Sequence, residues 1–151
     1  MRPKDVKVLN PGRLFNEDRT ISIEVPHDVF GMIIMISFYG TTGRKAHTLE
    51  NLRRVMDALD DTKCPYIIGG DFNIEVCDMS KLIAELEHHS RVMSGGMSCF
   101  TKDSVSTIDY FITSQTFSAQ SITCTTIESG LATHRPVYMQ WDAFQESVCV
   151  K

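Results

Sequence analysis

A run of apolar residues at positions 29–39, rich in Ile and Met, is the feature that most restricts how this chain can fold. A strand that is apolar on both faces has to be covered on both sides, as a central strand of a layered sheet is. The preceding segment 20–25 alternates apolar and polar residues, as a half-buried strand does, and Pro26-His27-Asp28 separates the two. The sequence therefore predicts a β-hairpin whose second strand lies in the core.

An amphipathic helix and a second short strand are predicted after this hairpin. Gly40 and Gly43 mark the turn that ends the apolar run. Apolar residues then recur at steps of three and four with charges between them, which predicts a helix packed on the sheet; they are Leu49, Leu52, Val55, Met56 and Leu59. The apolar segment 66–68 follows and ends at Gly69-Gly70. Strand, helix and strand in this order predict a βαβ crossover.

The rest of the chain changes from helix to short strands. Asp78 or Ser80 is a candidate cap for a second helix with Leu82, Ile83 and Leu86 on one face. Beyond Gly95-Gly96, strands are predicted at 98–101, 107–113, 121–127 and 137–141. A length of 151 residues predicts one domain, 1–151, with a mixed α/β architecture and helices on at least one face of the sheet.

Composition and charge exclude several classes of protein. With 42% hydrophobic and 23% charged residues the chain is not a disordered tail, and a net charge of −4 excludes a strongly basic nucleic-acid coat protein. Residues 1–54 carry a balance of +3 and the remaining residues −7. The acidic part could hold a cation, although a solvated surface is the better interpretation of the charge alone.

Cysteine spacing and the N-terminal residues predict a soluble intracellular protein. The five cysteines are far apart and form no CxxC pair, which argues against a disulfide framework and a structural zinc site and fits a reducing compartment. The first residues are charged and lack the apolar run of a signal peptide, and the longest apolar stretch is too short to span a bilayer. The sequence does not distinguish nucleus from cytoplasm, and no membrane partner is expected.

The segment Gly69-Gly70-Asp71-Phe72-Asn73 is the first candidate for chemistry. Functional groups of α/β sheets collect just beyond the carboxyl ends of strands, which is where Asp71 lies if 66–68 is a strand. An Asp can accept a proton or bind a hard cation, and an Asn can donate to a phosphate oxygen. Asp and Asn are also common turn residues beside Gly, and composition alone favours that interpretation.

Two further candidates are Asp109, within the predicted strand 107–113, and His134, before the last strand. Asp109 shares a strand face with Phe111, and a carboxylate in such surroundings needs a partner, for which an imidazole is suited. An edge-strand Asp facing water is an equally good interpretation. Pro136 keeps the chain extended, which places His134 on a loop suited to acid–base chemistry or phosphate contact. A surface residue is the alternative for any single His.

Taken in order, these motifs resemble the endonuclease/exonuclease/phosphatase family. The residues that carry the resemblance are Gly-Gly-Asp-Phe-Asn at 69–73, Ile-Asp-Tyr-Phe-Ile-Thr-Ser at 108–114, His-Arg-Pro-Val at 134–137 and the segment 35–40, which is similar to the family's strand ending in a phosphate-contacting Tyr. The resemblance runs from about residue 20 to 141. It implies half of a DNase I-like four-layer α/β sandwich, with a mixed, mainly antiparallel sheet and helices on one face.

The resemblance also implies a role for each site residue. Asp71 would orient and deprotonate the attacking water, Asn73 would hold the scissile phosphate, and both would bind Mg²⁺ or Mn²⁺. Asp109 would hydrogen-bond His134, which would stabilise charge in the transition state, and Tyr39 would contact the phosphate or the leaving oxygen. The implied activity is metal-dependent phosphodiester hydrolysis, with an endonuclease acting on DNA, retrotransposon-derived in one interpretation, favoured over an inositol or lipid phosphatase.

Two departures from the family pattern leave an alternative open. Thr133 replaces the acidic residue that normally precedes the His, and the chain matches only the second half of the fold, without the Asn and the metal-binding Glu of the first half. A truncated or degenerate domain that binds nucleic acid or protein without catalysis is therefore the competing hypothesis; an interaction module with chance motif matches is a third. A sheet with helices on one face only would leave an apolar face open, which predicts self-association or pairing with another polypeptide that supplies the missing half.

Overall fold

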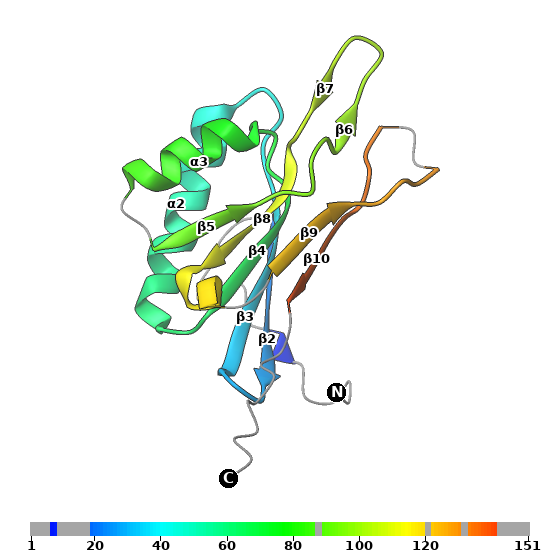
Figure 1. The fold of residues 1–151 in the computed structure, drawn as a ribbon. Coiled ribbons are helices and arrows are strands. Elements are labelled where there is room, and N and C mark those ends of the chain that lie inside the picture. The colour runs from blue at the N-terminus through cyan, green and yellow to red at the C-terminus, as the bar shows by residue number, and fades with distance from the viewer. Residues whose placement is uncertain (1–6, 9–18, 87–88, 120–121, 131–132, 142–151) are drawn as a thin grey trace.

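A computed structural model describes residues 7–8, 19–86, 89–119, 122–130 and 133–141 (Figure 1). Within these residues six strands form one sheet in the order β1-β2-β3-β4-β8-β5. All neighbouring strands are antiparallel except β3 and β4, which are parallel. The strands are β1 Lys7–Val8, β2 Thr20–His27, β3 Gly31–Tyr39, β4 Tyr66–Asp71, β5 Ser90–Met93 and β8 Asp109–Ser114. The predicted hairpin and mixed, mainly antiparallel sheet are confirmed.

Helix α2, Lys45–Thr62, connects β3 to the parallel strand β4, so the predicted βαβ crossover is confirmed. The expected apolar stripe faces the sheet: Leu52, Val55, Met56 and Leu59 are buried. The helix ends at Lys63, whose φ of 57° is left-handed.

Helix α3, Val76–Glu85, begins earlier than the sequence indicates, so the prediction that Asp78 or Ser80 caps it is wrong. The Val76 N–H donates to the Thr107 carbonyl at 3.0 Å. One N–H of the first turn, which has no partner within the helix, is thus paired by a neighbouring loop. Ser80 instead donates to the Val76 carbonyl at 2.8 Å from within the helix. Asp78 forms an exposed ion pair with Lys45 of α2, at 2.7 Å.

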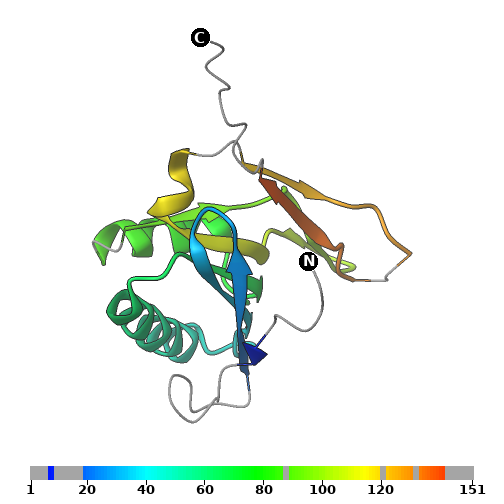
Figure 2. The same ribbon diagram turned by 90° about the horizontal axis from the view of Figure 1, so that it is seen from below.

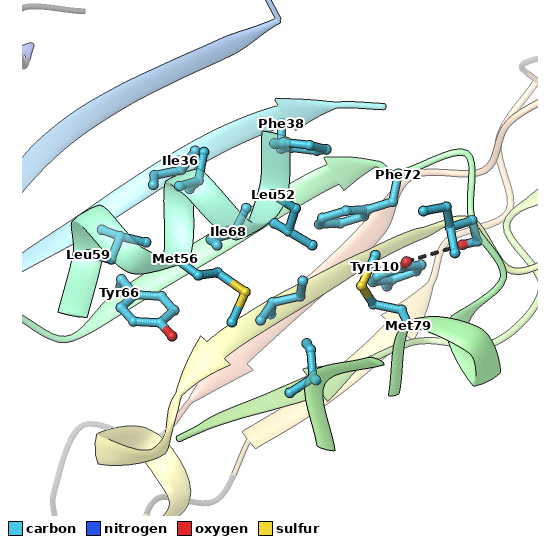
Figure 3. Close-up of a cluster of buried hydrophobic side chains, with 14 of the residues drawn as sticks. Ile36, Phe38, Leu52, Met56, Leu59, Tyr66, Ile68, Phe72, Met79 and Tyr110 are labelled. Carbon is cyan, nitrogen blue, oxygen red and sulfur yellow. Dashed lines mark hydrogen bonds between the residues drawn. The ribbon is translucent and has the colours of Figure 1, made fainter. Parts of the chain in front are cut away.

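The main core lies between the sheet and both helices, which cover the same face (Figures 1 and 2). Figure 3 shows its aromatic centre, in which Phe72 is stacked between two other rings. Its centroid lies 5.2 Å from that of Phe38 and 4.3 Å from that of Tyr110. The Tyr110 hydroxyl donates to the Ile74 carbonyl at 3.1 Å, drawn as a dashed line. Burial raises the pKa of Tyr110, which keeps this donor protonated.

The opposite face of the sheet is covered in its middle by a two-stranded ribbon, β9 Ile122–Thr126 and β10 Val137–Trp141, and by the 3₁₀ segment Gln115–Ala119 (Figure 2). Ile33, Ile67 and Phe117 are buried there. The expectation of an open face is therefore wrong for this part, because the ribbon folds back over it. Ile21 of the outer strand β2 remains 66% exposed. Self-association stays a prediction.

The remaining strand predictions need small corrections. The segment 98–113 contains a short hairpin, β6 Cys99–Phe100 and β7 Val105–Ser106, before β8 begins at Asp109. Strand β5 was not predicted, because its four residues are of mixed polarity and show no strand pattern in the sequence. It forms by pairing with β8. Among the described residues, no helix is both long and apolar enough to cross a membrane.

Candidate active site

Three of the predicted site residues form one row across neighbouring strands. Tyr39 at the end of β3 is the register partner of Asp71 at the end of β4, and Asp71 is the partner of Asp109 at the start of β8. Residues directly opposite one another project from the same face of a sheet. This face is the one away from the helices, because Phe72 and Tyr110, one position along each strand, enter the main core.

The Asp71–Asn73 loop is held by its own backbone and by the loop after β3. The Asn73 N–H donates to Asp71 Oδ1 at 2.9 Å, and the Gly40 N–H donates to the Asp71 carbonyl at 2.7 Å. Asn73 has a left-handed φ of 52°, which Asn tolerates better than most residues. Its Nδ2 donates to the Gly40 carbonyl at 3.1 Å, and its Oδ1 accepts from the Thr42 hydroxyl at 3.4 Å. The Asn73 amide is thereby oriented beside Asp71.

Partial burial raises the pKa of the Asp71 carboxyl above its ordinary value. The hydrogen bond from the Asn73 backbone opposes this shift, and the neighbouring Asp109 carboxylate adds to it because two like charges resist ionising together. A carboxylate with a raised pKa holds a proton more readily, which is a property of a general base.

His134 contacts Asp109 as the sequence predicts. His134 Nδ1 lies 2.9 Å from Asp109 Oδ2, with the side chains 38% and 19% exposed respectively. A carboxylate that accepts a hydrogen bond from Nδ1 keeps a proton on that nitrogen, so Nε2 is the ring atom that can take part in proton transfer or contact a substrate. The Asp109 backbone is fixed in turn, because its N–H donates to the Ser98 hydroxyl at 2.9 Å.

The loop that carries His134 is attached, on both sides of that residue, to the segment 98–100, which includes β6. The Phe100 N–H donates to the Thr133 carbonyl and the Arg135 N–H to the Ser98 carbonyl, each at 2.7 Å. The Arg135 guanidinium also lies 4.1 Å from the centre of the Phe100 ring. Thr133, which stands where the family has an acidic residue, is exposed. Its neutral hydroxyl adds no negative charge to the site.

Asp71, Asp109 and His134 form a compact cluster, in which one ligand atom from each residue lies within 4.8 Å of the others. They border a hollow of about 230 Å³ whose other lining residues are Gly70, Tyr110, Phe111, Arg135, Pro136 and Val137. Tyr39 reaches the same face through strand register and is 49% exposed, with the Arg19 guanidinium 5.2 Å from its ring centre. The roles assigned to Asp71, Asn73, Asp109, His134 and Tyr39 remain predictions.

Two neighbours of the site were not predicted from the sequence. Arg19 lies beside Tyr39, and Cys99 places its sulfur 3.7 Å from His134 Nε2. No short-range pattern marks either residue, because the contacts join segments 20 and 35 positions apart. Only the pairing of strands brings them together.

The donor set fits a hard divalent cation. Asp71 Oδ1 and Asp109 Oδ2 are engaged by Asn73 and His134, which leaves Asp71 Oδ2 and Asp109 Oδ1 available. Carboxylate oxygens are the ligands that Mg²⁺ and Mn²⁺ prefer, and a cation would offset the repulsion between the two carboxylates. Asn73 Oδ1, which accepts a 3.4 Å contact from the Thr42 hydroxyl, is a further oxygen of the kind that such a cation binds.

Comparison of the whole structure with solved structures gives consistent matches at low sequence identity. The Haemophilus ducreyi cytolethal distending toxin matches with a TM-score of 0.66 and 8% identity over 95% of this chain and 60% of that one. The endonuclease domain of TRAS1, a telomere-specific non-LTR retrotransposon, matches with a TM-score of 0.65 and 14% identity over 92% and 70%. The endonuclease/exonuclease/phosphatase from Bacteroides vulgatus gives 0.60 and 14% over 93% and 67%. No protein-family model and no curated protein matches the sequence.

The mixed α/β sheet with two helices on one face has the DNase I-like fold, and the Asp-Asp-His cluster lies at its strand ends. The chain has the fold of the endonuclease/exonuclease/phosphatase family, as the resemblance of its motifs predicts. It spans about 60% of the length of the first matched structures.

Proposed function

We propose that this chain catalyses divalent-cation-dependent hydrolysis of phosphodiester bonds, with DNA as the substrate. The observation that carries the proposal is the meeting of Asp71 with the Asp109–His134 pair at one rim of the sheet. A base and a held imidazole within a few ångströms are what an in-line attack on phosphorus requires. One of the matched folds, the TRAS1 endonuclease domain, supports DNA over a lipid or inositol phosphate.

In the proposed reaction Asp71 accepts a proton from the attacking water. The Asn73 N–H fixes its Oδ1, so the second carboxylate oxygen is free to face the water, and burial supports protonation. As the imidazolium, which has a proton on each nitrogen, His134 is held at Nδ1 by Asp109 and donates from Nε2 to a phosphoryl oxygen as negative charge develops. A cation held by Asp71 and Asn73 would polarise the phosphate. Asn73, in the loop after β4, and Tyr39, at the end of β3, position the phosphate.

The alternative function is a binding module without catalysis, and Thr133 is the observation that favours it. An exposed neutral side chain in place of an acid weakens the site's attraction for a hard cation. Such a module would retain the fold and the rim, and would bind nucleic acid or protein without cleaving it.

A nicking assay separates the two functions. Supercoiled, abasic-site and single-stranded DNA are incubated with the chain in Mg²⁺, Mn²⁺ or EDTA, beside Asp71→Asn. Loss of a general base costs about 10²–10⁴-fold, so the variant should nick at least a hundredfold more slowly. Asp78→Asn is the matched control, since it removes an exposed carboxylate outside the site.

Nicking that is equal in the wild-type chain and in Asp71→Asn would show contamination and contradict the proposal. DNA binding measured by fluorescence anisotropy, without nicking in any cation, would support the binding module instead.

A further inference from the structure

Two arginines lie at opposite ends of the row of site residues. The Tyr39 N–H donates to the carbonyl of Arg19, the residue before β2, at 2.9 Å, which continues the pairing of β2 with β3 by one position. Arg19 is therefore directly opposite Tyr39 and projects from the same face of the sheet. It extends by one strand the row that continues through Asp71 to Asp109. Arg135 lies past the other end of the row and lines the hollow that Asp71 and Asp109 border.

Both guanidinium groups lie against aromatic rings and keep N–H groups for a ligand. Arg135 is half-buried, with its guanidinium 4.1 Å from the centre of the Phe100 ring. Arg19 is exposed, lies 5.2 Å from the centre of the Tyr39 ring and donates one hydrogen bond to the Gly40 carbonyl at 3.3 Å. Among the described residues, neither arginine forms an ion pair with a carboxylate. A guanidinium has five N–H donors in a rigid fork, so one that rests on a ring still presents donors to the oxygens of a phosphate.

The length of the row fits a ligand with several phosphates. Neighbouring strands lie about 4.8 Å apart, so the row from Arg19 to Asp109 is roughly 14 Å long. One nucleic-acid strand carries a phosphate for about every 3.4 Å of helix axis, so about four nucleotides span this row. The two carboxylates in the middle repel a phosphate, whereas the arginines attract one at each end. A small phosphate ester has its charge in one place and reaches only one of the two arginines.

We propose that Arg19 and Arg135 bind backbone phosphates on opposite sides of the phosphate that is cleaved, and that together they select an extended nucleic-acid strand. The choice of a nucleic acid as the ligand rests on the proposed function. Arg135, on the face of Phe100, takes the phosphate beside His134, and Arg19 takes the phosphate beyond Tyr39. Neither contact requires catalysis, so the experiment measures binding.

The salt dependence of DNA binding counts the phosphate contacts. Fluorescence anisotropy of a labelled DNA duplex, titrated with the complete chain in EDTA at several salt concentrations, gives the slope of log K against log[salt]. Loss of one phosphate contact reduces the magnitude of this slope by about 0.9. Arg19→Ala and Arg135→Ala should each show this reduction and weaken binding roughly tenfold, the loss of one charge-assisted hydrogen bond. The double variant should show the sum of the two effects, because the two sites are well separated.

Two further variants separate a phosphate contact from other effects. Arg53→Ala removes an exposed arginine of α2, on the helix-covered side of the sheet, and is the matched control for the change in net charge. It should keep the affinity and the slope of the wild-type chain. Arg135→Lys retains the charge but not the planar fork, so it should keep the slope while binding more weakly than the wild-type chain. Thermal unfolding followed by circular dichroism confirms that each variant is folded.

The proposal is overturned if either Arg→Ala variant keeps the wild-type slope, if Arg53→Ala lowers the slope as much, or if the chain does not bind the duplex at low salt. A slope lowered equally in Arg135→Lys and Arg135→Ala would also overturn it, because Arg135 would then only hold its loop. Nicking that depends on Asp71, with unchanged slopes in the arginine variants, would retain the proposed function and lose only this inference. Reduced slopes, with nicking equal in the wild-type chain and in Asp71→Asn, would do the reverse.

Discussion

Replacing Phe72 by Ala tests whether the aromatic stack anchors the loop that carries Asp71 and Asn73. Phe72 is fully buried, with Phe38 on one side and Tyr110 on the other. Burial of an aromatic side chain of about 150–250 Å² corresponds to roughly 4–6 kcal/mol as an upper bound. Measured Phe→Ala substitutions in cores cost about 3–5 kcal/mol, which includes the cavity left behind. We expect Phe72→Ala to destabilise the chain by about 3–5 kcal/mol.

Thermal unfolding followed by circular dichroism measures this effect. At about 2–4 °C per kcal/mol for a chain of this size, Tm should fall by roughly 6–20 °C. Tyr138→Ala removes an aromatic ring that is 50% exposed and should change stability by only about 0.5 kcal/mol. A fall of less than about 3 °C for Phe72→Ala would refute the anchoring role, because the loop would then be held by its backbone hydrogen bonds alone.

Three further predictions concern the same region. Asp71→Asn should raise Tm at pH 7 in EDTA. The pKa of Asp71 in the folded state is raised above the ordinary value of 3.8, so the ionised carboxylate opposes folding. The increase in Tm should disappear in unfolding scans at pH values below 3.8, where the carboxyl is protonated in both states. Tyr110→Phe keeps the ring stack but leaves the buried Ile74 carbonyl without its donor, and urea unfolding should show a loss of about 1–3 kcal/mol. Gly70→Ala should cost at least about 2 kcal/mol in urea and slow nicking together with it, since a Cβ there would lie 1.9 Å from the Phe38 carbonyl oxygen; an unchanged midpoint would contradict the close packing of β3 on β4.

Periodicity in the sequence was sufficient to predict the elements of the main core. The apolar stripe of α2 and the alternation of β8 are both visible in the local spacing of apolar residues, and these are the residues that are buried. In β8, Tyr110 and Ile112 enter the core and Asp109 faces away from it. The bounds of β10 agree with the prediction at 137–141 for the same reason. The start of α3 could not be predicted this way, because the partner of the Val76 N–H is a carbonyl 31 positions away.

Short motifs in the sequence predicted which residues form the candidate site and in what order they occur along the chain, but not their contacts with residues outside the motifs. The motifs placed Asp71 after a strand and His134 before one. The contact between His134 and Asp109 was predicted because a half-buried carboxylate needs a partner such as an imidazole. Cys99 could not be found, because its proximity to His134 arises from a bridge between two short segments that carry no strong β pattern of their own. The spacing of cysteines along the sequence reveals only residues that are close in the chain, whereas Cys99 and His134 are brought together by strand pairing.

The position of the acidic row follows from the packing of the core. Ile68 and Phe72 on β4 and its extension, and Tyr110 on β8, enter the same apolar cluster, so strand alternation forces Asp71 and Asp109 to the other face. A slip of one residue in β8 would turn Asp109 toward the Phe72 ring and bring Tyr110 out to the rim. Burying an unpaired carboxylate against aromatic rings costs several kcal/mol. The apolar residues therefore select the register in which the two carboxylates meet, and the site is a consequence of the core rather than an addition to it.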